Sequence, residues 1–175
     1  PASITSCTVA VIVNKDGSEL VLRTSSLTDN GIIATVPDGA AVKLVDNRID
    51  FFDTQTHWAK DAVAFVSARE LFFGTSAATF APDAPMTRAM AAAVLARLDG
   101  MYISGGSSWH ENSVAWAVSR GISDGQDPGR DITREQLISM LYRYAGSPSA
   151  TDRQLHFYDA DAVSGYAQEA MCWAV

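Results

Sequence analysis

The sequence predicts a mainly helical protein that is built from repeats and preceded by a small antiparallel β-unit. The segment 87–100 begins with Thr-Arg, continues with apolar residues at helical spacing and ends in glycine. The segment 133–146 repeats this pattern without a gap, 46 residues further on, a period that is typical of stacked helical units. Residues 1–48 differ from both, because they contain β-branched runs that are separated by turn motifs.

The composition indicates a globular chain and excludes several functions. Of the 175 residues, 47% are hydrophobic and 19% are charged. The net charge of −7 argues against a nucleic-acid partner, because phosphate binding needs clustered Lys and Arg. No apolar run approaches the roughly 20 residues that span a bilayer. Since the chain starts at Pro1, we expect that a signal peptide has been removed or that the chain is a piece of a longer protein.

The β-unit is expected to contain four short strands. The sequences Asn-Lys-Asp-Gly, Asp-Asn-Gly and Pro-Asp-Gly between them are typical of tight turns. A unit of this size buries little apolar area, so we expect it to pack on a neighbour or to end a larger upstream domain. The expected strands are residues 8–13, 19–23, 32–36 and 41–45.

The first helix of each repeat is marked by two aromatic residues that are seven positions apart. This spacing places both rings on one helix face. Core packing is the prediction for these rings, and an aromatic floor for a sugar is the alternative. The first such helix is expected to include the residues from Trp58 to Arg69. The three pairs are Trp58/Phe65, Trp109/Trp116 and Tyr166/Trp173.

The second helix of each repeat has a clear beginning and end. Thr87 and Thr133 are good N-caps, because a hydroxyl can accept a bond from a backbone N–H of the first turn. Gly100 and Gly146 suit the left-handed conformation that ends many helices.

Two arginines occupy an unusual position in these second helices. Arg88 and Arg134 follow the N-caps directly, at the helix end whose dipole disfavours a cation. A solvated surface arginine is the simplest interpretation of one such residue. The repetition of the position favours a function in ligand binding.

Together these features resemble the S-layer homology repeat over about residues 51–175. The order is Phe-x-Asp, an aromatic helix, a glycine-containing loop, Phe-x-Pro-Asp and a Thr-Arg helix. Phe-x-Asp occurs at residues 51–53 and 157–159, whereas the second repeat has no obvious copy. The resemblance implies a pseudo-threefold helical bundle, here with an incomplete third repeat. A partner chain that completes the bundle is a further expectation.

The resemblance also sets the expected domain boundaries. The joints between repeats are expected to be polar linkers at residues 101–108 and 147–154. The expected segments are a small β-rich segment at 1–48, a first repeat at 49–100, a second repeat at 101–146, and a linker with the start of a third repeat at 147–175.

The resemblance implies a non-catalytic anchor at the outer surface of a Gram-positive cell. Such repeats bind an acidic, pyruvylated secondary cell wall polysaccharide. An arginine can grip the pyruvyl carboxylate bidentately, and free N–H groups at the helix start are expected to assist. A scaffold for protein–protein contacts or for assembly of a surface layer is the alternative. The candidate ligand-binding residues are Arg88, Arg134, Thr87, Thr133, Trp58 and Trp109.

The sequence departs from the family signature Thr-Arg-Ala-Glu, in which Glu completes a capping box. The fourth position is Met90 in one copy and Gln136 in the other. Gln136 can make the reciprocal bond to the N-cap, and Met90 is expected not to make it. Glu70 stands where a glycine often ends the first helix, whereas Gly121 matches the family in the second copy.

No catalytic or metal-binding motif is present, so we expect neither an enzyme nor a cofactor. The three histidines have no Cys or His at metal-ligand spacing. Asp53, Asp83 and Asp159 are expected to accept backbone N–H bonds in loops. Cys7 and Cys172 are expected to be small buried residues, with a mutual disulfide as the alternative.

Overall fold

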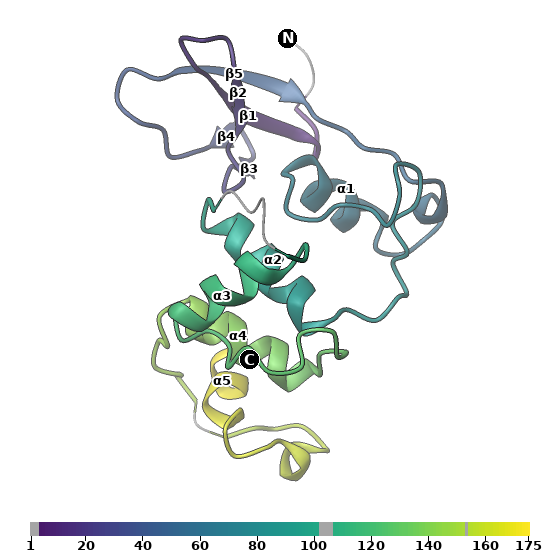
Figure 1. The fold of residues 1–175 in the computed structure, drawn as a ribbon, viewed down its shortest axis with the longest axis vertical. Coiled ribbons are helices and arrows are strands. Elements are labelled where there is room, and N and C mark those ends of the chain that lie inside the picture. Colours follow the sequence, from purple (N-terminus) through teal and green to yellow (C-terminus); the bar gives the residue numbers. More distant parts are fainter. Residues whose placement is uncertain (1–3, 102–106, 153) are drawn as a thin grey trace. The chain divides into compact units, whose positions relative to one another are not determined.

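The computed structural model describes residues 4–101, 107–152 and 154–175. The chain divides into two compact units, Pro1–Ala84 and Pro85–Val175, each with its own hydrophobic core (Figure 1). The expected linkers lie partly outside the described residues. Within the described ranges, no helix is both long enough and apolar enough to cross a bilayer.

The first unit contains five strands in two antiparallel sheets. Strand β1 is the centre of a sheet with the order β2-β1-β5, and β3 and β4 form a separate hairpin. The four expected strands are confirmed, although β2 and β4 are shorter than predicted. Strand β3 was not predicted, because three residues are too few to show alternation. The strands are β1 (Thr8–Val13), β2 (Glu19–Val21), β3 (Ser26–Thr28), β4 (Gly31–Ile33) and β5 (Ala41–Asp46).

One face of the larger sheet packs on helix α1 (Lys60–Ala68). Side chains alternate between the faces of a strand, so Val9 and Val11 of β1 share one face. They form a buried cluster with Cys7 and Ala68, against which Ala64 also packs. The small β-unit therefore gains its core from a neighbouring helix, as expected.

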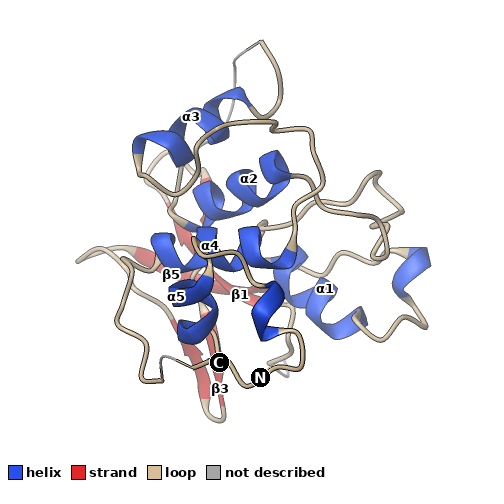
Figure 2. Cartoon of the chain, turned by 90° about the horizontal axis from the view of Figure 1, so that it is seen from below, coloured by secondary structure: helices blue, strands red, loops and turns tan. Residues whose placement is uncertain are grey.

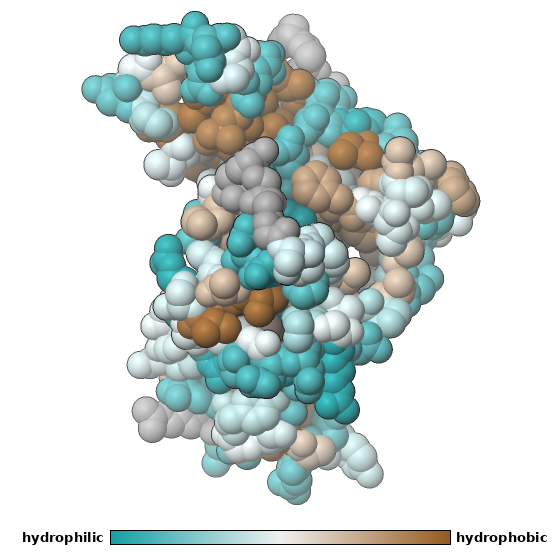
Figure 3. Space-filling view, in the orientation of Figure 1, coloured by the Kyte–Doolittle hydropathy of each residue, from teal (hydrophilic) through white to brown (hydrophobic). Residues whose placement is uncertain are grey.

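The other face of this sheet is apolar at its exposed positions. Ile12 lies opposite both Leu20 and Val42, and cross-strand partners share a face. Leu20, Val42 and Leu44 are exposed by 51%, 43% and 54%, whereas Ile12 is buried. Hydrophobic surface is visible over the β-unit in Figure 3.

Arg69 connects the two layers of the first unit. Its side chain is 1% exposed, and its guanidinium donates to the carbonyl oxygens of Ser25 at 2.7 Å and Ser6 at 3.0 Å. Further bonds run to the carbonyls of Phe65 at 3.1 Å and Thr8 at 3.4 Å. Burial lowers the pKa of Arg69. A cation with four carbonyl partners is satisfied without an anion, so it fixes the β-unit to the end of α1.

The second unit is a small helical assembly (Figure 2). Its core joins α2, α3 and α4, and α5 packs on α4. Ala91, Ala92 and Ala96 of α2 are almost fully buried, and these small side chains permit close helix packing. The helices are α2 (Arg88–Leu98), α3 (Glu111–Ser119), α4 (Arg134–Tyr144) and α5 (Gln168–Trp173), with short 3-10 helices at η1 (Phe52–Thr54) and η2 (Ala160–Ala162).

The ends of the second helices agree with the prediction. Gly100 and Gly146 have φ angles of 80° and 84°, in the left-handed region that glycine adopts without strain. Glu70 and Gly121 follow α1 and α3 with φ angles of 55° and 67°. Glu70 therefore has the same left-handed backbone as Gly121 and places a side chain where glycine is preferred.

The prediction for the three aromatic pairs is wrong for the first member of each pair. The first ring of each pair lies before its helix: Trp58 before α1, Trp109 before α3 and Tyr166 before α5. None of the three pairs therefore shares a helix face. The exposed fractions of these three side chains are 89%, 58% and 53%. Turns precede α1 and α3, with the N–H of Lys60 bound to the carbonyl of His57 and that of Glu111 bound to the carbonyl of Ser108. Core packing is correct only for the second members, of which Trp116 is buried.

The two cysteines are free and buried. This agrees with the expectation of small buried residues. The mainly helical fold with a small antiparallel β-unit is confirmed, while the division into repeats and their pseudo-threefold arrangement stay predictions. The two helices of the first predicted repeat fall in different units, with α1 in the first unit and α2 in the second.

Candidate functional site

Arg88 is held at the start of α2 by a local network that uses the N–H groups of the first turn. The N–H of Arg88 donates to the carbonyl of Arg130 at 3.0 Å, and that of Ala89 donates to the carbonyl of Pro128 at 2.8 Å. The N–H of Met90 donates to the Thr87 hydroxyl at 3.2 Å. The expectation that free N–H groups of this turn assist a ligand is therefore wrong for α2. Its first turn is already capped by the loop that precedes α4.

Both second helices close a capping box. The Gln136 Oε1 accepts the N–H of Thr133 at 3.0 Å, as predicted. The Met90 sulfur accepts the N–H of Thr87 at 3.5 Å, so the expectation that Met90 makes no reciprocal bond is wrong. A thioether sulfur is a weak acceptor, but it is still an acceptor. A methionine can therefore occupy the position of the glutamate in the Thr-Arg-Ala-Glu signature.

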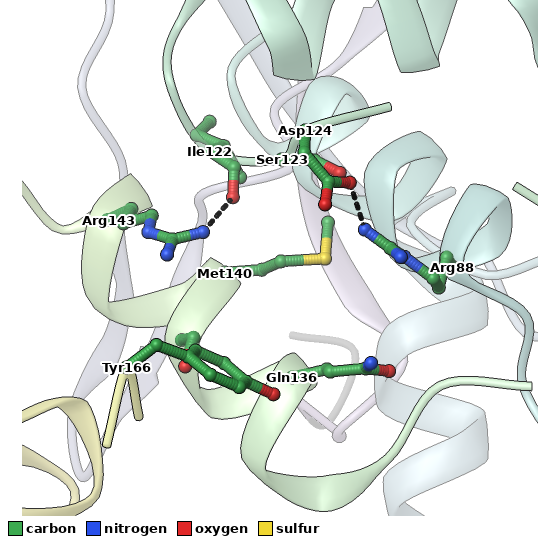
Figure 4. Close-up of a pocket in the computed structure, with 9 residues that line it drawn as sticks. Arg88, Ile122, Ser123, Asp124, Gln136, Met140, Arg143 and Tyr166 are labelled. Carbon is green, nitrogen blue, oxygen red and sulfur yellow. Dashed lines mark hydrogen bonds and ion pairs between the residues drawn. The ribbon is translucent and has the colours of Figure 1, made fainter. Parts of the chain in front are cut away.

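A cavity of about 290 Å³ lies beside Arg88 in the second unit (Figure 4). Its walls come from the start of α2, the loop after α3, one side of α4 and Tyr166, which lies two positions before α5. With the predicted repeat boundaries, all three repeats contribute to it. The lining residues are Arg88, Ile122, Ser123, Asp124, Gln136, Ser139, Met140, Arg143 and Tyr166.

Two guanidinium groups and one carboxylate dominate the charge of this cavity. Arg88, with a side chain that is 16% exposed, forms an ion pair with Asp124. Arg143 approaches from the opposite side and donates to the carbonyl of Ile122 at 3.2 Å (Figure 4). The Gln126 N–H, and then the Arg88 charge, lower the pKa of Asp124. Among the lining residues one carboxylate faces two cations, so the lining itself carries a net positive charge that suits an anionic group.

The remaining predicted site residues lie elsewhere. Thr87 and Thr133 act as N-caps, and neither lines the cavity. Arg134 is exposed and also lies outside the lining. Trp109 is not among the lining residues, and Trp58 belongs to the first unit. Arg88 is the predicted residue that the cavity contains, and the functions of the other five stay predictions.

Sequence reasoning did not select Arg143, Asp124 or Tyr166 for this site. Arg143 carried a usable signal, because it aligns with Arg97 in the first copy. Asp124 lies in a glycine-containing loop that differs in length between the copies. Its meeting with Arg88 is a tertiary contact between residues that are 36 positions apart.

The Phe-x-Asp and Phe-x-Pro-Asp motifs of the first repeat form a clasp. The Asp53 carboxylate accepts the N–H of Phe80 at 3.0 Å and that of Ala81 at 2.7 Å. These bonds, that of Phe80 above all, lower the pKa of Asp53. The rings of Phe51 and Phe80 lie 5.4 Å apart. The motifs therefore join the segment before α1 to the loop after it, a structural function.

The other two expected loop carboxylates behave differently. The Asp83 carboxylate lies 3.2 Å from His57 Nε2 and has no backbone N–H donor among the described residues. The Asp159 carboxylate has no such donor in the described part of the chain either. Of the three predictions, that for Asp53 is confirmed.

The chain thus contains a loop clasp that is formed by two short motifs, and a cavity beside the helix start at Arg88. Comparison with family models gives its class a name: residues 50–92 match the S-layer homology domain. This segment is thus similar to the S-layer homology domain, a module that anchors surface proteins to the cell wall. Its matched residues include the Phe-x-Asp motif, α1 and the Thr-Arg start of α2.

Three curated relatives align with larger parts of the chain. An endoglucanase from Bacillus sp. (strain KSM-635) is 29% identical over 142 residues, which are 71% of this chain and 15% of the relative. Endo-1,4-beta-xylanase A from Thermoanaerobacterium saccharolyticum is 28% identical over 121 residues, covering 62% of this chain and 10% of the relative. An amylopullulanase from Thermoanaerobacterium thermosulfurigenes is 28% identical over 106 residues, covering 53% and 6%.

The chain thus spans at most 15% of the length of these relatives. Their names describe enzymes, and the aligned part is a small fraction of each. No solved structure is significantly similar to the chain. The similarity therefore concerns a module that these large enzymes share with this chain.

Proposed function

We propose that this chain is a cell-surface anchor that binds a pyruvylated secondary cell wall polysaccharide through the cavity beside Arg88. The observation that carries the proposal is the pair of guanidinium groups, Arg88 and Arg143, on opposite sides of a cavity of about 290 Å³. A pyruvyl ketal presents one carboxylate, which suits a planar guanidinium fork. The match of residues 50–92 to the S-layer homology domain supports the same function.

Asp124 has a defined part in this proposal. It neutralises Arg88 while no ligand is bound, and its own side chain is 63% exposed. An incoming carboxylate exchanges with Asp124 for Arg88, and Arg143 on the opposite side of the cavity adds a second cation. Because the incoming carboxylate replaces Asp124 as the partner of Arg88, the exchange leaves no buried charge unpaired. A single cavity of this kind gives modest affinity, and several cavities along one polymer increase retention.

The test is calorimetric titration with isolated wall polymer, native against chemically depyruvylated. We expect the Arg88→Ala variant to lose about tenfold or more in affinity for the native polymer, because it lacks the bidentate fork. Arg130→Ala is the matched control, since Arg130 is a 78% exposed arginine outside the cavity. Arg134→Ala measures the second predicted site.

Two results would contradict the proposal. One is equal binding of the native and the depyruvylated polymer. The other is an Arg88→Ala variant that binds as well as Arg130→Ala. A folded protein that binds neither polymer would also contradict the proposal and would favour the alternative function.

The alternative is an assembly scaffold of a surface layer, in which copies of the chain associate. The apolar sheet face around Leu20, Val42 and Leu44 favours this candidate, because it offers exposed apolar side chains next to one another. The mass of the protein in solution tests it. A monomer at high concentration would exclude self-association through this face.

A further inference from the structure

We infer that Glu135 is a positioning residue for the cavity, because it holds Tyr166 in place as one wall of the ligand site. The inference rests on the proposed function and deepens it. It concerns the position after the arginine, which is Ala89 in the first copy and Glu135 in the second.

The contacts of the Glu135 carboxylate carry this inference. One oxygen accepts the backbone N–H of Ser164 at 2.9 Å. The other accepts the Ser164 hydroxyl at 2.9 Å and the Tyr166 hydroxyl at 3.1 Å. These bonds, led by that of the Ser164 N–H, lower the pKa of Glu135. One side chain of α4 thus fixes both ends of the segment 164–166.

The fixed segment forms part of the cavity. Tyr166 lines it together with Gln136 and Ser139, which lie one and four residues after Glu135 on α4. The hydroxyl of Tyr166 is occupied by Glu135, so the ring is what remains for a ligand. The ring is 53% exposed, and an aromatic ring packs well against the apolar face of a sugar.

Helix α2 shows that a Thr-Arg helix folds without a carboxylate at the position of Glu135. Ala89 occupies the equivalent place, is 1% exposed and has no side-chain acceptor. The α2 helix starts with the same cap and the same arginine. Glu135 therefore serves the contact between α4 and the segment before α5, and through it the place of Tyr166.

The test compares Glu135→Ala, which installs the residue of the first copy, with Glu135→Gln. We expect Glu135→Ala to bind the native wall polymer about three- to tenfold more weakly. Glu135→Gln keeps a carbonyl oxygen as acceptor and is expected to stay within about twofold of the unmodified chain. Asp161→Ala is the matched control, because it removes an exposed acid of the same unit.

A spectroscopic measurement separates positioning from a general loss of structure. The absorbance difference between the protein and its Tyr166→Phe variant reports the titration of this phenol. Burial and then the Glu135 carboxylate raise the pKa of Tyr166. We expect that pKa to fall in Glu135→Ala, together with a loss of hydrogen-exchange protection at the Ser164 amide.

Two results overturn the inference while leaving the proposed function intact. One is binding by Glu135→Ala that equals binding by the unmodified chain. The other is weaker binding by Glu135→Ala with an unchanged Tyr166 titration. A lack of polymer binding by the unmodified chain overturns the proposed function and this inference together.

Discussion

Arg69 and Arg88 show how one residue type performs two different tasks in this chain. Arg69 is 1% exposed and donates to four carbonyl oxygens, so its guanidinium has a structural function. Arg88 pairs with an exposed carboxylate at the edge of a cavity, so its charge is exchangeable. Repetition in the sequence pointed to Arg88, whereas no pattern distinguished Arg69 from other helix residues.

Replacement of Arg69 by methionine tests its structural function. We expect Arg69→Met to lower the free energy of unfolding by about 2–4 kcal/mol, because buried carbonyls lose charged donors. Arg48→Met is the matched control, since Arg48 is 48% exposed and pairs with Asp46 at 3.9 Å. Urea unfolding followed by circular dichroism measures both variants. Equal losses in the two variants would show that the carbonyl contacts do not stabilise the unit.

The clearest elements in the sequence were the second helices, because caps, periodicity and glycine stops agree there. The first helices were placed too early, at Trp58 and Trp109. An aromatic spacing of seven residues also fits a ring that lies before the helix, so the pattern alone does not locate the start. The left-handed backbone at Glu70 could be anticipated only from its alignment with Gly121, because glutamate itself gives no signal of that conformation.

The two capping boxes allow a paired exchange at the third helical position. We expect Met90→Gln to stabilise the protein by about 0.5–1 kcal/mol, because an amide oxygen is a stronger acceptor than a thioether. Gln136→Met is the reciprocal change and is expected to destabilise by a similar amount. Thermal unfolding of both variants measures this. Shifts of the same sign would contradict the capping account.

At the scale of the molecule, the sequence predicted the β-unit and the helical repeats, but not how they group. Repetition suggests that each repeat is one structural unit. Instead α1 packs with the β-unit and α2 packs with α3 and α4. The cavity follows from this grouping and depends on residues that are far apart in sequence, such as Arg88 and Tyr166. No local sequence pattern predicts a contact between residues that are so far apart, so Arg88 was the lining residue that the sequence assigned to the ligand site.

The overall charge leads to a prediction about the rate of binding. The chain carries a net charge of −7, and the proposed polymer is acidic, so the two repel each other at long range. Salt shortens the Debye length from about 30 Å at 0.01 M to about 10 Å at 0.1 M. We expect the association rate to rise about two- to tenfold over this range. Surface plasmon resonance on immobilised polymer measures this, and an association rate that falls with salt would contradict it.

The cap on α2 also determines how long a segment must be if it is to be fused to another protein as an anchor. The N–H groups of Arg88 and Ala89 are bound by the carbonyls of Arg130 and Pro128, which belong to the following repeat. A fusion tag that ends after Gly100 would leave these two donors without acceptors and Arg88 without Asp124. The smallest transferable anchor therefore extends from α2 through the segment that holds Tyr166, and a single repeat is not an interchangeable cassette.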